Sequence, residues 1–238
     1  MAELRDARWP DVAAGPREVL VLPVGSLEQH GPHLPLDTDA FVAAAVAARL
    51  CEHRPAAGLA PVLPFGASGE HAGFPGTLSI GTEALLLAVV ELVRHAAADW
   101  GAVLAVNGHG GNADALRRAA ELCRHEGRRL DVVHLGLPGM DAHAGRAETS
   151  IMLHLAPGRV RTDLAAAGDT RPVRELLPVL RAEGVRAVSP NGVLGDPAGA
   201  SAAEGERLVA QQVAAVVAAY DATLSAVRAA GGGVPDRG

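Results

Sequence analysis

Apolar runs and amphipathic segments alternate along most of this chain. Residues 18–25 (EVLVLPVG) form a continuous apolar run that ends at a glycine, a pattern typical of a strand buried on both faces. Residues 38–53 (TDAFVAAAVAARLCEH) follow with helical spacing, and we expect Thr38 or Asp39 to cap that helix. The same reasoning predicts a short, Pro-interrupted strand that runs into a polar loop over 58–71, and further strands at 102–107 and 128–136. Further helices are predicted at 81–101, 113–127, 148–158 and 202–230.

Strands that alternate with helices of this length indicate an α/β fold. Parallel neighbours need a crossover helix, so the pattern predicts a mostly parallel sheet covered by helices on both faces. With no internal repeat and no linker, we expect one domain over residues 1–238. Residues 1–17 would be an N-terminal extension, and residues 231–238 (GGGVPDRG) a flexible tail.

Composition narrows the class of protein. Only 3% of the residues are aromatic, so the core must be built from Ala, Val and Leu. The net charge is -6 without a basic block, which argues against nucleic acid and anionic membranes as partners. The N-terminus lacks the apolar segment of a signal peptide, and no apolar run reaches the roughly 18 residues of a membrane span. Two distant cysteines, Cys51 and Cys123, suit a reducing interior, so we expect a cytoplasmic protein.

Polar side chains gather where three of the predicted strands end. The first cluster is GSLEQHGPHLPLDTD at 25–39, the second is NGHGGN at 107–112, and the third is DAHAGRAETS at 141–150. Ligands of open parallel sheets bind beyond the carboxyl ends of the strands. We therefore expect these three clusters to meet at one edge of the sheet.

The residue types in the clusters favour a metal site. Glu28 and His30 are two apart, so in an extended segment their side chains point the same way. Carboxylates and imidazoles together suit Zn, Mn or Fe(II) rather than a thiolate site. The remaining candidates are Asp39, His109, His143 and Glu148.

Each of these residues alone has an ordinary structural interpretation: a loop histidine, a helix cap, or a carboxylate in a first helical turn. Their conjunction at three strand ends favours a site, because unpaired buried charges are too costly to be accidental. His33 and Asp37 are expected to shape the loop around the site or to support the ligands from behind. Of the other histidines, His71 in SGEHAGFPGT (68–77) is the first that we would add, because its loop also follows a strand.

The motifs LPVGSLEQHGPHLPLDTD, NGHGGN and HAGRAETS together resemble those of the creatininase family of metal-dependent amidohydrolases. The resemblance covers residues 19–204. It implies a three-layer α/β/α fold, a site for two divalent metal ions and a homohexamer. It also implies metal ligands at Glu28, His30, Asp39 and His109, with Asp39 bridging the metals. His143 matches the proton-transfer histidine, and Glu148 a carboxylate near the metals.

Two departures from creatininase itself change the expected substrate and ligand set. Creatininase has a glutamate ligand where this chain has Gly111, and we expect Glu148 to replace it. Creatininase also closes tryptophans over its substrate, whereas this chain has only Trp9 and Trp100, away from the equivalent loops. Creatinine is therefore not the expected substrate.

A narrower resemblance, carried by residues 184–208 and 143–157, is to the mycofactocin-system branch of the family. It implies a peptidase that releases the modified C-terminal Val-Tyr dipeptide from a ribosomally made precursor. The glycine-rich loop 189–201 would then be a surface loop, or a lid or subunit-contact segment that shapes the pocket. Two alternatives stay open: hydrolysis of a small cyclic or formylated amide, and a non-catalytic metal-binding partner of a biosynthetic complex.

Overall fold

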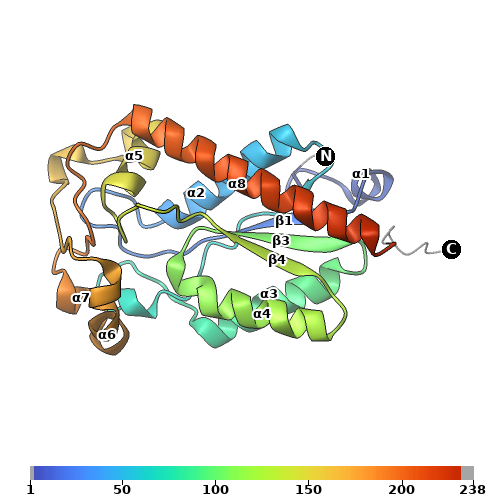
Figure 1. Cartoon of the computed structure of the whole chain (residues 1–238), viewed down its shortest axis with the longest axis horizontal. Coiled ribbons are helices and arrows are strands. Elements are labelled where there is room, and N and C mark those ends of the chain that lie inside the picture. The colour runs from blue at the N-terminus through green and yellow to red at the C-terminus, as the bar shows by residue number, and fades with distance from the viewer. Residues whose placement is uncertain (1–2, 232–238) are drawn as a thin grey trace.

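The computed structural model describes residues 3–231 and contains one parallel sheet. Its strands are β1 (Val19–Val24), β2 (Gly58–Leu59), β3 (Ala102–Asn107) and β4 (Leu130–His134), in the order β2-β1-β3-β4 (Figure 1). Val24 pairs with Asn107, and Asn107 pairs with His134. The last residues of β1, β3 and β4 are therefore neighbours, and the loops that follow them leave the sheet at one edge.

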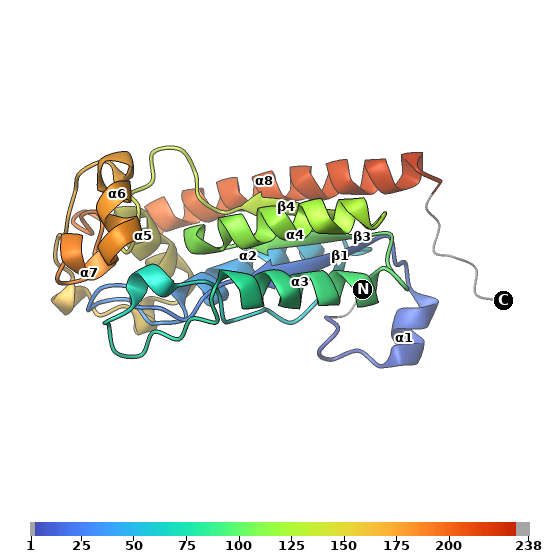
Figure 2. The ribbon, with the colours of Figure 1, turned by 90° about the horizontal axis from the view of Figure 1, so that it is seen from below.

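Helices cover both faces of the sheet (Figures 1 and 2). One face packs against α2 (Thr38–His53), α5 (Arg146–Leu155) and α8 (Ala202–Ala229), and the other packs against α3 (Thr82–Ala96) and α4 (Ala113–His125). Both cores consist mainly of Ala, Val and Leu, and strands β1 and β3 are buried along their whole length. The expected α/β class, with a parallel sheet between two helical layers, is confirmed.

The structure also contains helices that the pattern does not predict. These are α1 (Trp9–Ala14), α6 (Val173–Glu183), α7 (Val185–Val188) and four short 3-10 turns, at Gly69–His71, Gly110–Asn112, Pro157–Arg159 and Thr162–Leu164. Helix α6 has apolar residues at helical spacing, but it contains Pro178, which disfavours a helix in the sequence, and only Leu176 is buried. Helix α1 lies in the predicted N-terminal extension. Of the predicted tail only Gly231 is described, and the rest lies outside the described residues.

The expected cap of α2 is wrong. Its N-cap is Asp37, whose side chain makes no capping bond and instead accepts a hydrogen bond from Arg159. Thr38 donates its hydroxyl to the carbonyl of Pro35. Asp39, in the first turn, directs its carboxylate to Ser26 and His30. The carboxylate of Asp39, which the sequence suggests as a helix cap, instead contacts side chains of the loop after β1 at the sheet edge.

By length and composition, α8 is the one helix within residues 3–231 that is able to cross a membrane. Its buried side chains include Val209, Val213, Val216 and Tyr220, and they pack into the core shared with α2 and α5. Core helices of globular proteins pass the same test of length and hydropathy, and we interpret α8 as one of them.

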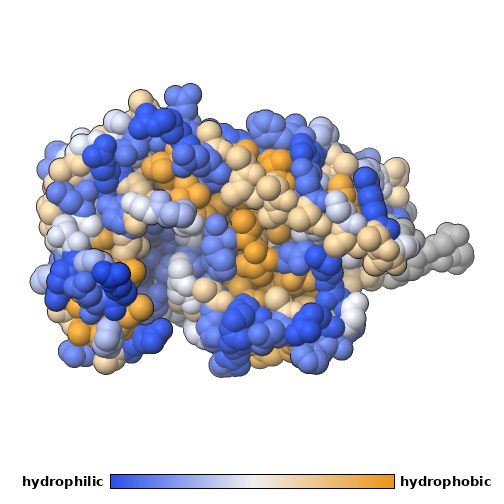
Figure 3. Space-filling model, viewed as in Figure 1, coloured by the Kyte–Doolittle hydropathy of each residue, from blue (hydrophilic) through white to orange (hydrophobic). Residues whose placement is uncertain are grey.

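The face in Figure 3 carries a band of apolar residues between α8 and α4, above the free edge of β4. Val132 and Val133 of this edge strand are only half-buried. Exposed leucines also lie on α3, where Leu87 and Leu92 are 57% and 46% exposed. Parts of the surface of this chain are therefore unusually apolar for their position.

Candidate metal centre

The three polar clusters meet at the sheet edge. The loop after β1 places Glu28 and His30, the first turn of α2 places Asp39, and the loop after β3 places His109. These four side chains are 0–6% exposed. The segment before α5 adds His143, and its first turn adds Glu148. All six predicted residues are brought together.

Glu28, Asp39 and His109 form the first group of donors. The ring of His109 lies between the two carboxylates, with Nε2 3.2 Å from Oε2 of Glu28 and Nδ1 3.2 Å from Oδ2 of Asp39. The hydroxyl of Ser26 is 2.7 Å from Oε2 of Glu28 and 2.9 Å from Oδ2 of Asp39. One hydroxyl hydrogen serves only one of these oxygens at a time, and the ring nitrogens of His109 face both.

His30, His143 and Glu148 form the second group, next to Asp39. His30 donates from Nδ1 to the carbonyl of Glu28 at 3.1 Å, which leaves its Nε2 3.1 Å from Oδ1 of Asp39. The rings of His30 and His143 have centroids 4.4 Å apart. Each oxygen of Asp39 therefore faces a different imidazole, one in each group.

A backbone hydrogen bond orients Glu148, since its Oε2 accepts from the N–H of Ala144 at 2.6 Å. Ala144 has φ 51 and is the one non-glycine residue with a positive φ among residues 3–231. Such a conformation persists only where the surroundings enforce it, and it is concentrated at functional sites. Burial raises the pKa of Glu148 to about 7.

The electrostatics show which charges the cluster stabilises. Burial alone would raise the pKa of Glu28, yet the neighbouring imidazolium of His109 lowers it to about 2. Burial would lower the pKa of His30, yet the carboxylate of Asp39 raises it to about 10. Protons on His30 and His109 thus neutralise the two carboxylates. Burial and the charge on His30 lower the pKa of His143 to about 3, so His143 stays neutral.

These residues fit divalent metal ions. Within residues 3–231, His, Asp and Glu side chains form three groups whose ligand atoms lie within 4.8 Å of one another: Glu28–Asp39–His109, His30–His143–Glu148 and Glu28–His71–His143. Oε1 of Glu28 is buried with no hydrogen-bond partner among the described residues. Nitrogen and oxygen donors of this kind suit Zn, Mn and Fe(II).

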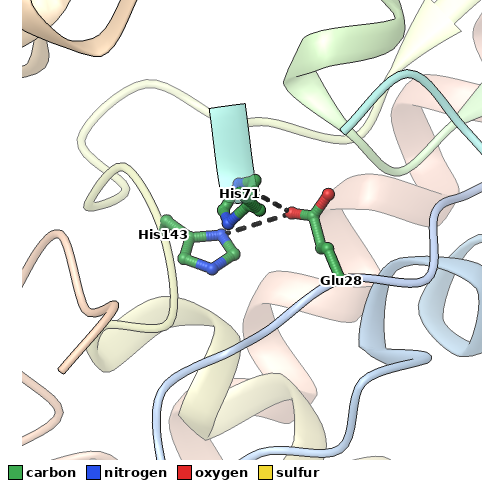
Figure 4. Close-up of side chains that lie close together, drawn as sticks. All are labelled: Glu28, His71 and His143. Atoms are coloured by element: carbon green, nitrogen blue, oxygen red, sulfur yellow. Dashed lines mark ion pairs between the residues drawn. The ribbon is translucent and has the colours of Figure 1, made fainter. Parts of the chain in front are cut away.

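The predicted site omits three side chains that the structure places in it: Gln29, Glu70 and His71. Figure 4 shows His71 beside His143, with both rings directed at the same oxygen of Glu28. The distances to that oxygen are 3.2 Å from Nε2 of His71 and 3.7 Å from Nδ1 of His143. The sequence indicated His71 only through its place in a loop that follows a predicted strand. Gln29 and Glu70 gave no signal of their own.

Glu70 fills the space beside Gly111. A side chain at Gly111 would collide with the carboxylate of Glu70, whose Oε1 lies 3.4 Å from Nε2 of His109. Glu70 is partly exposed, with 32% of its side-chain surface open to solvent. A carboxylate from another loop, that of Glu70, thus lies beside Gly111, and the replacement of the creatininase glutamate by Glu148 stays a prediction.

The loop 189–201 forms part of the wall of the cluster. The carbonyl of Gly192 accepts a hydrogen bond from Nε2 of Gln29 at 2.9 Å. Leu194 pairs with His143 through two backbone hydrogen bonds, of 2.9 and 3.1 Å. The interpretation of this segment as a surface loop is therefore wrong for residues 192–194, which hold site residues in place.

His33 and Asp37 contact other parts of the structure. Nε2 of His33 lies 2.9 Å from the hydroxyl of Thr149, and Asp37 pairs with Arg159. Neither belongs to a donor group, as expected for residues that shape the loop. A cavity of about 410 Å³ adjoins the cluster; its lining includes Asp39, His109, His134, Met140 and Glu148. A larger hollow of about 560 Å³ lies at the opposite end of the sheet, around Trp100.

Comparison with known proteins agrees with this geometry. The family model described as "Creatininase: Creatinine amidohydrolase" matches residues 5–220. The chain is 53% identical over 200 residues to the mycofactocin precursor peptide peptidase of Mycolicibacterium smegmatis, covering 82% of this chain and 81% of the relative. It is 32% identical over 182 residues to the creatinine amidohydrolase of Pseudomonas putida, covering 64% and 69%.

Solved structures give the same result for the fold. A manganese form of creatininase superposes with a TM-score of 0.75 at 27% identity, covering 93% of this chain and 98% of that one. A creatininase variant of Zn-Zn type has a TM-score of 0.76 at 27% identity, covering 94% and 99%.

Proposed function

Because the chain belongs to the creatininase family, we propose that its sheet-edge cluster is a two-metal centre that hydrolyses a peptide. Family membership makes the protein a metal-dependent hydrolase of amide or peptide C–N bonds. The proposed metal ligands are Glu28, His30, Asp39, His109 and Glu148. The observation that carries this assignment is the position of the Asp39 carboxylate. One of its oxygens faces His30 and the other faces His109.

The metals proposed are Zn, Fe(II) or Mn. Solved creatininases with manganese and zinc support this set. Bound divalent ions lower the pKa of a water molecule and polarise the carbonyl of the scissile bond. The donors of this chain do not select one of the three metals, because they are all nitrogen or oxygen atoms.

His143 is the proposed proton carrier. Burial keeps it neutral, so one ring nitrogen is free to take a proton from the attacking water and to pass it to the leaving nitrogen. The water oxygen forms the new bond to the carbonyl carbon as the C–N bond breaks. Glu148, held by the N–H of Ala144, is the second proposed catalytic residue and orients the reacting groups beside His30.

The substrate proposed is the mycofactocin precursor peptide, from which the enzyme would release the modified C-terminal Val-Tyr dipeptide. The support is the 53% identity to a peptidase named for that precursor, across four-fifths of both chains. Creatinine is disfavoured because neither tryptophan reaches the cluster: Trp9 is 82% exposed on α1, and Trp100 lies in the core against Gly58.

Mass spectrometry of the modified precursor peptide, incubated with metal-loaded protein, tests this function. Loss of the dipeptide mass is the expected result, and Asp39→Ala protein is the control. An unchanged peptide together with turnover of a small cyclic or formylated amide would favour the other hydrolytic function. Bound metal without any hydrolysis would favour a non-catalytic partner, which the presence of both His143 and Glu148 argues against.

We also propose a homo-oligomer, a homohexamer by family resemblance, working in the cytoplasm. The apolar band beside β4 and the exposed leucines of α3 are surfaces that copies of this chain would cover. Cys51 and Cys123 are both free thiols, which suits a reducing compartment. Light scattering coupled to gel filtration measures the assembly directly.

A further inference from the structure

The orientation of the Gln29 side-chain amide is fixed by two backbone groups. Its Oε1 accepts from the N–H of Gly31 at 2.8 Å, and its Nε2 donates to the carbonyl of Gly192 at 2.9 Å. A backbone N–H only donates and a carbonyl only accepts, so exchanging the amide oxygen and nitrogen would break both bonds. Gln29 is 5% exposed, and bonds lost there would not be replaced by water.

This orientation determines the tautomer of His71. The second hydrogen on Nε2 of Gln29 points to Nδ1 of His71, at 2.9 Å. Nδ1 must therefore accept, and in a neutral imidazole the other nitrogen then carries the hydrogen. An imidazolium donates from both nitrogens, so an accepting Nδ1 also requires the ring to be neutral. His71 presents an N–H at Nε2, the atom 3.2 Å from Oε1 of Glu28.

The backbone of Gln29 determines the tautomer of His143. Nε2 of His143 lies 2.7 Å from the carbonyl oxygen of Gln29 and 3.1 Å from Nε2 of its side chain. The carbonyl requires a donor, and both hydrogens of the amide nitrogen are already used by Gly192 and His71. Nε2 of His143 therefore carries the hydrogen, and its Nδ1 presents a lone pair 3.7 Å from Oε1 of Glu28.

We propose that Gln29 is a positioning residue that holds His71 and His143 in the same tautomer with opposite ends toward Glu28. The Nε2–H of His71 and the Nδ1 lone pair of His143 lie nearest the same carboxylate oxygen, at 3.2 and 3.7 Å, although neither makes a hydrogen bond to it (Figure 4). Two chemically identical side chains, with ring centroids 4.5 Å apart, thereby become a donor and an acceptor.

Two consequences follow for the centre. His71 does not bind metal through Nε2, because its Nδ1 accepts from Gln29 and a neutral ring then keeps its hydrogen on Nε2, so the donor group Glu28–His71–His143 is excluded as a metal site. Nδ1 of His143 is the atom that takes the proton from the attacking water and returns it to the leaving nitrogen. This second consequence rests on the proposed function, whereas the tautomers do not.

Long-range ¹H–¹⁵N correlation spectra of the full chain, labelled at histidine, test the proposal. Signals are assigned with His71→Gln and His143→Gln, and spectra are recorded without metal and with zinc. We expect both residues to carry hydrogen at Nε2 and none at Nδ1, and His71 Nε2 to keep its hydrogen when zinc binds. A His71 signal with hydrogen at Nδ1, or coordination of zinc through His71 Nε2, overturns the proposal.

Variants of similar size at position 29 separate tautomer control from simple packing. In Gln29→Glu the carboxylate accepts where the amide donates, so His71 should gain a hydrogen at Nδ1. In Gln29→Met the donor is lost and the single tautomer of His71 should give way to a mixture. Gln211→Glu, exposed on α8, is the control and should leave both spectra unchanged. A His71 tautomer that is the same in all three variants contradicts the proposal.

Metal analysis and kinetics give independent readings. His71→Gln should retain the metal content of the wild type. Gln29→Met should lower kcat at least about tenfold with KM within about twofold, because Gln29 acts through the histidines. If the spectra agree with the prediction but the precursor peptide is not cleaved, the proposed function fails and the tautomer assignment stands.

Discussion

Asp39 offers its two oxygens to different imidazoles, with Oδ1 3.1 Å from Nε2 of His30 and Oδ2 3.2 Å from Nδ1 of His109. Glu28 also spans the two groups, but less closely on one side: its Oε2 lies 3.2 Å from Nε2 of His109, and its Oε1 lies 3.7 Å from Nδ1 of His143. Asp39 therefore makes the closer link between the two halves of the proposed centre, and its loss should affect both metals together.

Asp39→Ala is expected to lose both metals rather than one. The apparent affinity should fall by at least about 100-fold, since even residues that only support metal ligands contribute roughly 10–100-fold. Plasma mass spectrometry after gel filtration measures the metal per chain. Asp37→Ala, two residues earlier and paired with Arg159 near the surface, should keep both metals. Retention of one full equivalent by Asp39→Ala would show that Asp39 does not bridge.

His143→Ala should keep its metal and lose activity. The neutral ring contributes proton transfer, a step that is typically worth about 10²–10⁴-fold in rate. Turnover of the peptide and metal content, measured on the same preparation, distinguish this role from that of a ligand. A variant that turns over normally would refute the role, and a variant that loses its metal would make His143 a ligand through its group with His30 and Glu148.

Glu70→Gln and Gly111→Ala should both weaken metal binding, the second more strongly. Glu70→Gln removes a carboxylate 3.4 Å from Nε2 of His109, and we expect a metal affinity roughly 10-fold lower. In Gly111→Ala the new methyl group meets Nε2 of His109 and the carbonyl of Ala67 as well as Glu70, so a proposed ligand is displaced and the loss should be larger. Gly110→Ala is the control, since a methyl group there meets nothing within 4 Å. An unchanged metal affinity in Gly111→Ala would contradict this expectation.

Metal binding should release protons. Burial lowers the pKa of His30, but Asp39 raises it to about 10, so in the metal-free protein this ring is protonated at neutral pH. A metal at Nε2 must displace that proton. The apparent affinity should therefore rise with pH toward about 10 and fall in acid. Calorimetric titration with zinc in buffers of different ionisation enthalpy counts the protons, and a heat independent of the buffer contradicts this expectation.

The sequence predicts this fold and six of the nine side chains of this site for a physical reason. Residues 25–39, 107–112 and 141–150 each follow a strand, and the ends of neighbouring parallel strands meet whatever the helices do. Glu70 and His71 enter from a 3-10 turn whose position depends on contacts with α6 and α7, including Gly184 against the backbone of Glu70. Helix α6 contains Pro178 and helix α7 is only four residues long, so neither was predicted from the sequence and the approach of this turn was not predictable.

The cap of α2 illustrates the same limit in one residue. Asp39 in the first turn satisfies the sequence rule for a helix start, and a cap is the commoner use of such a carboxylate. In the structure the hydroxyl of Ser26 and the rings of His30 and His109 compete for it. The local sequence could not show which of these groups Asp39 would contact, because they come from segments up to 70 residues away.

The loop 189–201 should matter through Gly192. This glycine has φ 83, and a methyl group on it would collide with the amide of Gln29. Gly192→Ala should therefore displace Gln29 and lower peptide turnover at least about tenfold while the metal stays bound, because no proposed ligand lies in this loop. The left-handed backbone adds a cost of roughly 1–2 kcal/mol for alanine, which thermal unfolding would register.

Gly199→Ala separates that backbone cost from the collision. Gly199 lies in the same loop with φ 75, and a methyl group there meets only the guanidinium of Arg146, at 3.4 Å. Both variants should lose a similar amount of thermal stability from the strained backbone, but only Gly192→Ala should lose activity. Equal activity in the two would mean that the contact between Gly192 and Gln29 does not position the histidines. Equal loss would point to the loop as a whole.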